Sequence, residues 1–293
     1  MWQAVFVRDA LLRAHSGLHI ELVGITTEGD RTLDVPLAEK GGKGLFLKEL
    51  EQALLDGRID LAVHSMKDVT VTEPDGLHIP VICEREDPHD ALVSTRFGDL
   101  CELPDGAVVG TCSLRRQSLL RYRFPQLKVE NLRGNVNRRL QRLDDGDFDA
   151  IILAAAGLLR LQMAGRIRQR IPTDIMLPAV GQGAVGVQCR ADDAKTTSLL
   201  APLDHVPTHA RITAERAANA HLGGGCHLPI GAFAKIEGEQ LHLRGLVGRP
   251  DGSNILFASA KGLVSEAEAV GHTLADDLLG QGAKALLQEF ANA

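Results

Sequence analysis

The segment His64-Ser65-Met66-Lys67-Asp68 places an amine and a carboxylate side by side, directly after a predicted strand. In open α/β sheets, the ends of such strands border the ligand crevice. Asp68 could stabilise a cation or move a proton, and Lys67 could hold an anion. The segment alone favours a simpler interpretation, in which Asp68 caps a turn and Lys67 is solvated.

A second candidate is the stretch 115–142, which holds nine basic residues and one acidic residue in a chain of net charge −6. Eight of the nine are arginines, whose planar guanidinium group binds carboxylates and phosphates through paired hydrogen bonds. Four residues lie where a predicted strand gives way to a predicted helix: Thr111, Ser113, Arg115 and Arg116. Backbone N–H groups and the helix dipole at such a junction also favour anions.

Two other interpretations compete for this basic stretch. An RNA-binding face would need interleaved aromatic side chains for base stacking, and only Tyr122 and Phe124 are present. Ordinary solvated helix surface accounts for Arg121, Arg138 and Arg142. A site for a polyanionic small molecule is the best account of the remaining basic residues.

A third candidate is Gly223-Gly224-Gly225-Cys226, which places a thiol at the end of a sterically open loop. Glycine permits the close approach of a bulky group. An accessible thiolate is a good nucleophile and can form covalent adducts. The glycines could equally serve only to make a tight turn, and spacing alone leaves the two interpretations even.

Two glycine-rich motifs indicate loops rather than nucleotide sites. Gly181-Gln182-Gly183-Ala184-Val185-Gly186 matches G-x-G-x-x-G, but a dinucleotide fingerprint follows a strand and opens a helix. Here Pro178 precedes the motif and a strand-like run overlaps its end, so we expect a hinge-like loop and no NAD site. Gly41-Gly42-Lys43-Gly44 lacks the spacing and hydroxyl of a Walker A loop.

Length and composition bound the remaining possibilities. The 293 residues suggest two or three domains, and 44% hydrophobic content is ordinary for a globular protein. No apolar run reaches the roughly 18 residues of a membrane span, and the opening residues do not resemble a signal peptide. The five cysteines contain no Cys-x-x-Cys, which argues against a disulfide framework and for a cytoplasmic location. Familiar zinc spacing is absent. The acidic balance argues against a general nucleic-acid or anionic-membrane binder.

Hydrophobic periodicity predicts the elements that position these residues. Helices are expected at 2–15, 45–56, 114–124, 136–144 and 210–222, and from Ser265, where Glu268 completes a capping-box pattern. Strands are expected at 18–25, 59–63, 107–110, 127–131, 148–153, 185–189, 230–236, 241–247 and 255–260. The alternation of strands and helices predicts two α/β lobes with mostly parallel sheets, and the C-terminal strands and helix predict a small α+β domain.

Six motifs in order make the chain resemble the porphobilinogen deaminase family over about 190 residues. They are Gly41-Gly42-Lys43-Gly44-Leu45-Phe46, His64-Ser65-Met66-Lys67-Asp68, Cys112-Ser113-Leu114-Arg115-Arg116-Gln117, Leu132-Arg133-Gly134-Asn135, Pro178-Ala179-Val180-Gly181-Gln182-Gly183 and Gly224-Gly225-Cys226. The resemblance implies a transferase of porphyrin and haem biosynthesis, the hydroxymethylbilane synthase. It condenses four porphobilinogen molecules head to tail with loss of ammonia, and hydrolysis then releases hydroxymethylbilane.

The resemblance also implies a cofactor and a set of site residues. Cys226 matches the cysteine that carries a dipyrromethane primer through a thioether, and Asp68 matches the catalytic aspartate. The primer cleft would contain Ser65, Lys67, Thr111, Ser113, Arg115 and Arg116. Arg133, Arg139, Arg160 and Gln182 would line the path of the substrate. No metal or nucleotide is required, and the implied partner is porphobilinogen alone, bound by a monomer with neither nucleic acid nor membrane.

The implied fold has two lobes of the type II periplasmic-binding-protein arrangement, with the chain crossing between them twice. Residues 1–83 and 184–202 would form the first lobe, and 84–183 the second, Arg-rich lobe. Residues 203–293 would form a third, α+β domain that has a three-stranded sheet and carries Cys226. The stretch 27–44 matches the mobile active-site loop of the family, which could shield reactive intermediates from water.

The N-terminus departs from the family pattern. Members begin with a strand whose following turn supplies an arginine and a serine to the active site, and here the chain opens at Met1-Trp2-Gln3. We expect a start assigned too far downstream or a truncated chain, with an unpaired sheet edge, low stability and little turnover. The alternative function is therefore a truncated family member that is inactive or only binds pyrroles. A solute-binding protein is the main rival, since it shares the two-lobed fold but needs no covalent primer.

Overall fold

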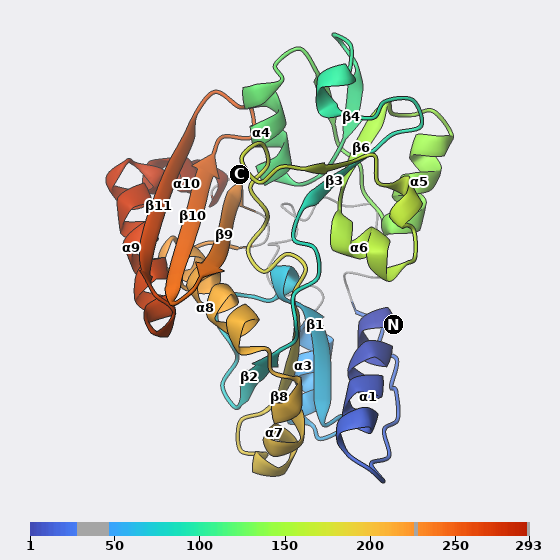
Figure 1. Ribbon diagram of the computed structural model, residues 1–293, viewed down its shortest axis with the longest axis vertical. Helices are drawn as coiled ribbons and strands as arrows, with labels where there is room; N and C mark the ends of the chain where they lie inside the picture. Colours follow the sequence, from blue (N-terminus) through green and yellow to red (C-terminus); the bar gives the residue numbers. More distant parts are fainter. Residues whose placement is uncertain (28–46, 226–227, 292–293) are drawn as a thin grey trace.

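The computed structural model describes residues 1–27, 47–225 and 228–291. Its elements form two α/β lobes, one above the other, and a C-terminal domain at their side (Figure 1). The described strands form three separate sheets, of three, five and three strands. In the part of the chain that the structure describes, no helix is both long and apolar enough to cross a bilayer.

The first lobe is built on a sheet of order β1-β8-β2. Its strands are β1 (Leu61–Ser65), β2 (Leu77–Ile82) and β8 (Val185–Arg190), and its helices are α1 (Trp2–Ala14), α3 (Lys48–Leu55) and α7 (Ala194–Leu200). Helix α1 buries Val7 and Leu11 in a hydrophobic cluster that also contains Val187 of β8. The predicted helix at 2–15 and the strand at 185–189 are thus confirmed within a residue.

Two expectations for this lobe are wrong. Strand β8 pairs antiparallel with both β1 and β2, so the described sheet is not mostly parallel. The reason is the chain path, because β8 enters from the second lobe rather than through a helical crossover from a neighbouring strand.

Residues 18–25 form no strand, although Leu18 and Ile20 contact the core. Alternating polarity buries one side of a segment, but a strand also needs a partner for its hydrogen bonds.

The second lobe is built on a five-stranded sheet of order β5-β4-β6-β3-β7. Its strands are β3 (Asp90–Val93), β4 (Val108–Gly110), β5 (Lys128–Glu130), β6 (Ala150–Ala154) and β7 (Gln169–Ile171), and its helices are α4 (Leu114–Arg123), α5 (Val136–Asp144) and α6 (Ala155–Arg160). Strand β4 lies parallel to β5 and β6, whereas β3 lies antiparallel to β6 and β7. The sheet is therefore mixed, again because the strand that enters from the other lobe runs against the βαβ strands.

The chain leaves the first lobe after β2 and returns to it at β8, so it crosses between the lobes twice. We call residues 83–89 the outward crossover and residues 172–184 the return crossover. This path is the one expected of the two-lobed periplasmic-binding-protein arrangement, and the prediction of two α/β lobes is confirmed.

The third domain holds an antiparallel sheet of β9 (Ile230–Glu237), β10 (Gln240–Gly248) and β11 (Ile255–Leu263), as predicted. Its helices are α8 (Val206–His221), α9 (Ala267–Gly280) and α10 (Ala283–Ala291). The expected capping box is wrong, because Ser265 lies in a 3₁₀ turn, Val264–Glu266, and α9 begins after it. The cap of α9 is Glu266, whose side chain makes no capping hydrogen bond.

His64 gives the first lobe a testable pH dependence. Its buried Nε2–H donates to Oε1 of Gln188 at 3.0 Å, and burial lowers the pKa of His64 from 6.5 to about 4 despite that bond. Between pH 6.5 and 4 the unfolded chain takes up a proton that the folded chain refuses, so stability falls with pH by about 3 kcal/mol in total. When urea unfolding is measured at several pH values in this window, the free energy of unfolding of His64→Gln should depend less steeply on pH than that of the parent protein. The exposed His19→Gln should follow the parent protein, and equal slopes for both variants would contradict the burial argument.

Candidate active site

Lys67 and Asp68 lie on a turn that is fixed to the return crossover. Strand β1 ends at Ser65, and residues Met66–Asp68 form one turn of 3₁₀ helix. The Met66 side chain is buried and its backbone N–H donates to the carbonyl of Ala184 at 3.0 Å. Lys67 is half-buried and Asp68 is exposed. The turn therefore holds Asp68 at the end of a strand, next to the point where the chain returns from the second lobe.

The motif Gly181–Gly186 forms this point of return. Gly181 and Gly183 have φ of +71° and +88°, a backbone conformation that favours glycine. A Cβ on Gly183 would overlap the carbonyl oxygen of Glu86 in the outward crossover. The motif leads directly into strand β8 and not into a helix, so its glycines serve the close passage of two backbone segments.

Gly183→Ala should therefore cost about 2–4 kcal/mol of folding free energy, through a strained φ and the overlap with Glu86. Gly146→Ala is the matched control, because Gly146 has a φ of +86° but open space where its Cβ would lie. The control should cost only about 1 kcal/mol. Denaturant unfolding would measure both, and equal costs would show that the two crossovers do not touch.

Arg115 and Arg116 begin helix α4, and the structure places both inside the protein. They are 2% and 6% exposed, and both bind the carboxylate of Asp90, the first residue of β3. Nη1 of Arg115 donates to Oδ2 at 2.7 Å, while Nε and Nη2 of Arg116 donate to Oδ1 at 3.0 and 2.7 Å. Nη1 of Arg116 also donates to the carbonyl of Ile152. The positive charge at this helix start is thus partly neutralised by an acid from the chain itself.

Charges from both lobes meet around Lys67. Asp68 raises the pKa of Lys67, but burial and the positive charges of Arg116 and Arg139 outweigh it, so the pKa is lowered. Burial also lowers the pKa of Arg139, whose charge interacts with those of Arg116, Arg133 and Asp68. The first lobe supplies Lys67 and Asp68, and the second lobe supplies the arginines. Four cations therefore act on one another beside two carboxylates, Asp68 and Asp90, and this excess of positive charge suits an anionic ligand.

The other predicted second-lobe residues lie near this group. Nε of Arg139 donates to the carbonyl of Gly134 at 2.7 Å, which fixes its guanidinium group on α5. Thr111 is buried, and its Oγ1 accepts the N–H of Ser113 at 3.3 Å. Ser113 is the N-cap of α4 and makes no side-chain capping bond. Its hydroxyl group is therefore not committed to the helix.

Three further predicted residues contact the crossovers or helix α1. Oγ of Ser65 accepts Nε2–H of Gln3 at 2.6 Å. Nη2 of Arg160 donates to the carbonyl of Gly183 at 2.8 Å, and its guanidinium lies 5.4 Å from the ring centroid of Trp2. The buried Gln182 donates to the carbonyl of Pro88 at 2.7 Å and to Oδ1 of Asp90 at 2.9 Å. The contacts of Arg160 and Gln182 place them where the two lobes meet, and Ser65 pairs with Val185, the first residue of β8 after the return crossover.

The glycines before Cys226 end helix α8. Gly223 has a φ of +67°, its N–H donates to the carbonyl of Ala220, and the N–H of Gly224 donates to that of Asn219. This pair of bonds is the Schellman motif, which requires glycine or asparagine at its first position. The tight-turn interpretation thus accounts for Gly223. Cys226 lies outside the described residues, as does 28–46, which includes nearly all of the predicted loop 27–44.

Sequence reasoning missed three buried charged residues: Arg85, Asp90 and Glu215. Glu215 of α8 is fully buried and accepts Nη1 and Nη2 of Arg85 at 2.6 and 3.2 Å. It also accepts the N–H groups of Gly181 and Ala234 at 2.8 and 2.9 Å. One signal was available for Asp90, because an acid that opens the apolar run Ala91-Leu92-Val93 must be buried and therefore paired.

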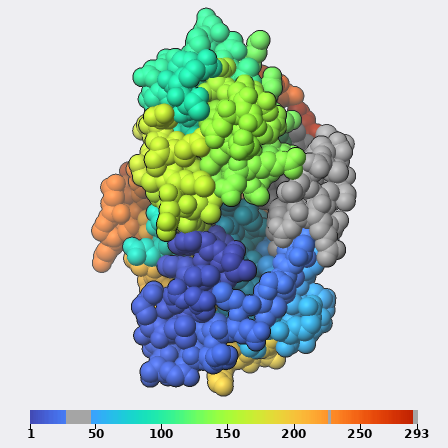
Figure 2. Space-filling model, turned by 90° about the vertical axis from the view of Figure 1, so that its right-hand side faces the viewer, coloured from blue at the N-terminus to red at the C-terminus, as the bar shows by residue number. Residues whose placement is uncertain are grey.

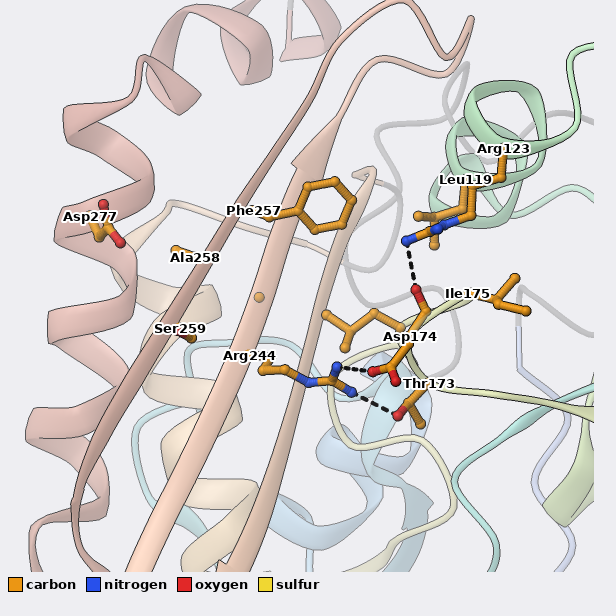
Figure 3. Close-up of a pocket in the computed structure, with 12 residues that line it drawn as sticks. Leu119, Arg123, Thr173, Asp174, Ile175, Arg244, Phe257, Ala258, Ser259 and Asp277 are labelled. Atoms are coloured by element: carbon orange, nitrogen blue, oxygen red, sulfur yellow. Dashed lines mark hydrogen bonds and ion pairs between the residues drawn. The ribbon is translucent and has the colours of Figure 1, made fainter.

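The surface is hollowed between the first lobe, in blue, and the second lobe, in green (Figure 2). A separate pocket of about 450 Å3 lies between α4, residues 173–177 and the sheet of the third domain (Figure 3). Nη2 of Arg244 donates there to Oγ1 of Thr173 at 2.7 Å, and Nη2 of Arg123 donates to the carbonyl of Asp174 at 2.6 Å. None of the predicted site residues lines this pocket, so it belongs to the seam between the second lobe and the third domain.

Two lobes joined by paired crossovers, with cations from both lobes gathered near Asp68 and Asp90, define a two-lobed protein whose cleft suits an organic polyanion. The chain belongs to the porphobilinogen deaminase family. The family model described as "Porphobilinogen deaminase, dipyromethane cofactor binding domain" matches residues 1–198, and "Porphobilinogen deaminase, C-terminal domain" matches residues 209–280. These matches confirm the predicted family, its hydroxymethylbilane synthase activity in tetrapyrrole biosynthesis and its dipyrromethane-binding domain.

Solved structures with partial similarity include periplasmic binding domains. The VFT2 domain of Bordetella pertussis BvgS is 18% identical, with 68% of this chain and 75% of that chain covered and a TM-score of 0.39. A periplasmic substrate-binding protein of an ABC transporter from Coxiella burnetii is 15% identical, with 69% and 86% covered and a TM-score of 0.43. With TM-scores below 0.5, these similarities add nothing to the assignment.

Proposed function

We propose that Asp68 is the catalytic residue of this porphobilinogen deaminase and that the surrounding cations hold its carboxylated pyrroles. The observation that carries the proposal is the meeting of Lys67, Arg116, Arg133 and Arg139 beside Asp68. Each pyrrole of the substrate bears an acetate and a propionate, so a growing oligomer gains negative charge with every addition. A cationic cleft offsets this charge, and because Asp90 is buried in its pairing with the arginines, Asp68 is left to face the pyrrole nitrogen.

The donor set fits a dipyrromethane cofactor. Ser65, Lys67, Thr111, Ser113 and Arg116 offer hydroxyl, ammonium and guanidinium donors for carboxylates, and Arg115 is proposed with them. Among the described residues, the buried Nε atoms of Arg115 and Arg160 have no hydrogen-bond partner, so each can still donate to a ligand. When bound, dipyrromethane supplies the pyrrole carbon to which the first substrate ring is joined.

Asp68 is proposed to stabilise a positive charge and to accept a proton. Loss of ammonia from porphobilinogen leaves a cationic, electron-poor ring, and a carboxylate near the pyrrole N–H stabilises that charge. The same carboxylate can accept the proton that the ring system releases after carbon–carbon bond formation. Arg133, Arg139 and Arg160 are proposed to orient the incoming substrate through its carboxylates, and Gln182 is proposed to line the path of the substrate.

We further propose that Cys226 carries the primer through a thioether, which intact-mass measurement can test. The purified protein should show an added mass of two pyrrole units, and Cys226→Ser should lose it. Cys101→Ser is the control, because Cys101 is an exposed free cysteine far along the chain from the glycine turn. An unmodified protein that also fails to load primer from porphobilinogen would overturn the proposal. A primed protein without turnover would instead favour a family member that only binds pyrroles.

The remaining proposals concern organisation. The three domains are proposed to comprise residues 1–83 with 184–202, 84–183 and 203–293. Porphobilinogen is the substrate implied by the family, and we propose a cytoplasmic monomer. Size-exclusion chromatography with light scattering tests the monomer, for which the expected mass is 31.5 kDa plus primer.

A further inference from the structure

We propose that Asp90 is a positioning residue for this reaction, which turns the guanidinium of Arg116 toward the ligand cleft and fixes it relative to Asp68. The inference rests on the proposed function of the cleft. Asp90 is fully buried and is the first residue of β3, directly after the outward crossover. It therefore cannot touch substrate itself, and it acts through the residues that it binds.

The carboxylate of Asp90 accepts hydrogen bonds from three side chains. Oδ1 receives Nε and Nη2 of Arg116 at 3.0 and 2.7 Å and Nε2 of Gln182 at 2.9 Å. Oδ2 receives Nη1 of Arg115 at 2.7 Å. Burial alone would raise the pKa of Asp90, but the two guanidinium groups outweigh it and lower the pKa, so the group stays ionised. A charged acceptor with this many donors has one orientation, and so do its arginines.

The two arginines leave Asp90 in different directions. Nη1 of Arg115 also donates to the carbonyl of Leu177 at 2.5 Å, and its Cδ lies 3.1 Å from where a Cβ would stand on Gly231 of β9. Arg115 is thus held against the return crossover and the third domain. Arg116 instead donates Nη1 to the carbonyl of Ile152 at 2.9 Å, on β6 of the second lobe. Its charge acts on Lys67 and Arg139, and the charge of Asp90 also acts on Lys67. Asp90 therefore holds Arg115 next to the third domain and Arg116 next to the cations around Asp68.

A continuous set of bonds connects this arrangement to the catalytic turn. Gln182 binds both Asp90 and the carbonyl of Pro88 in the outward crossover. Two residues later, the carbonyl of Ala184 accepts the N–H of Met66, which starts the turn that carries Asp68. The position of Arg116 relative to Asp68 is thus fixed through Asp90 and the return crossover.

The balance of charge also favours a functional role. Asp90 faces two arginines. One positive charge is left over at a buried site, and such a charge is costly unless an anion approaches it. A carboxylate of the pyrrole ligand is the anion that the proposed function provides.

The test is a double-mutant cycle with Asp90→Asn and Arg116→Gln in the full-length protein. Three quantities are measured: kcat and KM for porphobilinogen, the primed fraction by intact mass, and the thermal shift caused by added porphobilinogen. Asp90→Asn alone should lower kcat/KM at least 10-fold and reduce the primed fraction. In the Arg116→Gln background it should change each quantity less than twofold, because its effect passes through Arg116. Asp149→Asn is the control, since Asp149 binds Arg96 and the N–H of Val108 in the same lobe.

If Asp90→Asn lowers kcat/KM by the same factor in the parent protein and in Arg116→Gln, the proposal is overturned and Asp90 is a structural residue. If Asp90→Asn does not fold, Asp90→Glu keeps the charge but moves the carboxylate by one methylene, and it should show the same dependence on Arg116 at a smaller size. A parent protein with neither primer nor turnover would overturn the proposed function instead. In that case the thermal shift with porphobilinogen still decides whether Asp90 and Arg116 act as one unit.

Discussion

Asp68→Asn is expected to lower kcat by about 100- to 10,000-fold, the range typical for loss of a positioned acid or base. Asparagine keeps the size and the turn but removes the negative charge. The loss should fall on kcat more than on KM, because Lys67 and the arginines still bind the carboxylates of the substrate. Steady-state kinetics with porphobilinogen would measure both parameters. Intact mass would show whether the variant still carries its primer.

Two companion variants sharpen this test. Asp68→Glu keeps the carboxylate but moves it by one methylene, so it should retain more activity than Asp68→Asn. Asp147→Asn removes a surface carboxylate that forms an exposed ion pair with Arg142, and it should leave the kinetics unchanged. Asp68→Asn with more than a tenth of the parent kcat would show that the carboxylate is not the catalytic group. A loss confined to KM would assign Asp68 to binding instead.

Local patterns predicted those elements whose stability is local. Helix α5 was expected at 136–144 and spans Val136–Asp144, with Asn135 as its cap through a bond to the N–H of Arg138. The three C-terminal strands were likewise expected within a few residues, because tight turns and alternating burial define a meander. Strand direction was not predictable in the same way. It depends on where the chain returns after a crossover, and periodicity does not contain that information.

The residues of the candidate site also differ in whether local sequence patterns could predict them. Lys67 and Asp68 follow a recognisable strand, and the family resemblance identified them together with the arginines. The sequence did not show that Arg115 and Arg116 share one buried acid, because Asp90 lies 25 residues before Arg115. Nor did it show Glu215, whose partners Arg85 and Gly181 lie 130 and 34 residues away. Buried charges at such separations are visible only when the fold brings them together.

Glu215→Ala is expected to cost about 3–5 kcal/mol of folding free energy, the largest stability effect that we predict. Glu215 and Arg85 have side chains that are 0% and 2% exposed, so the change leaves an unpaired guanidinium in the interior. It also removes the acceptor for the N–H groups of Gly181 and Ala234. These two groups belong to the return crossover and to β9, so the attachment of the third domain to the lobes should weaken. Denaturant unfolding followed by circular dichroism would measure the cost.

The matched control for Glu215 is an ion pair of similar length at the surface. Arg166 and Asp144 lie 2.6 Å apart with side chains 34% and 41% exposed, and Asp144→Ala should cost less than about 1 kcal/mol. Arg85→Met should also lower the folding stability strongly, because it leaves the carboxylate of Glu215 buried without its cation. The double variant Arg85→Met/Glu215→Leu should recover only part of the loss, since the N–H groups of Gly181 and Ala234 still lack an acceptor. Full recovery would mean that Glu215 serves Arg85 alone, and a cost for Glu215→Ala no larger than that of the surface control would mean that it does not join the domains.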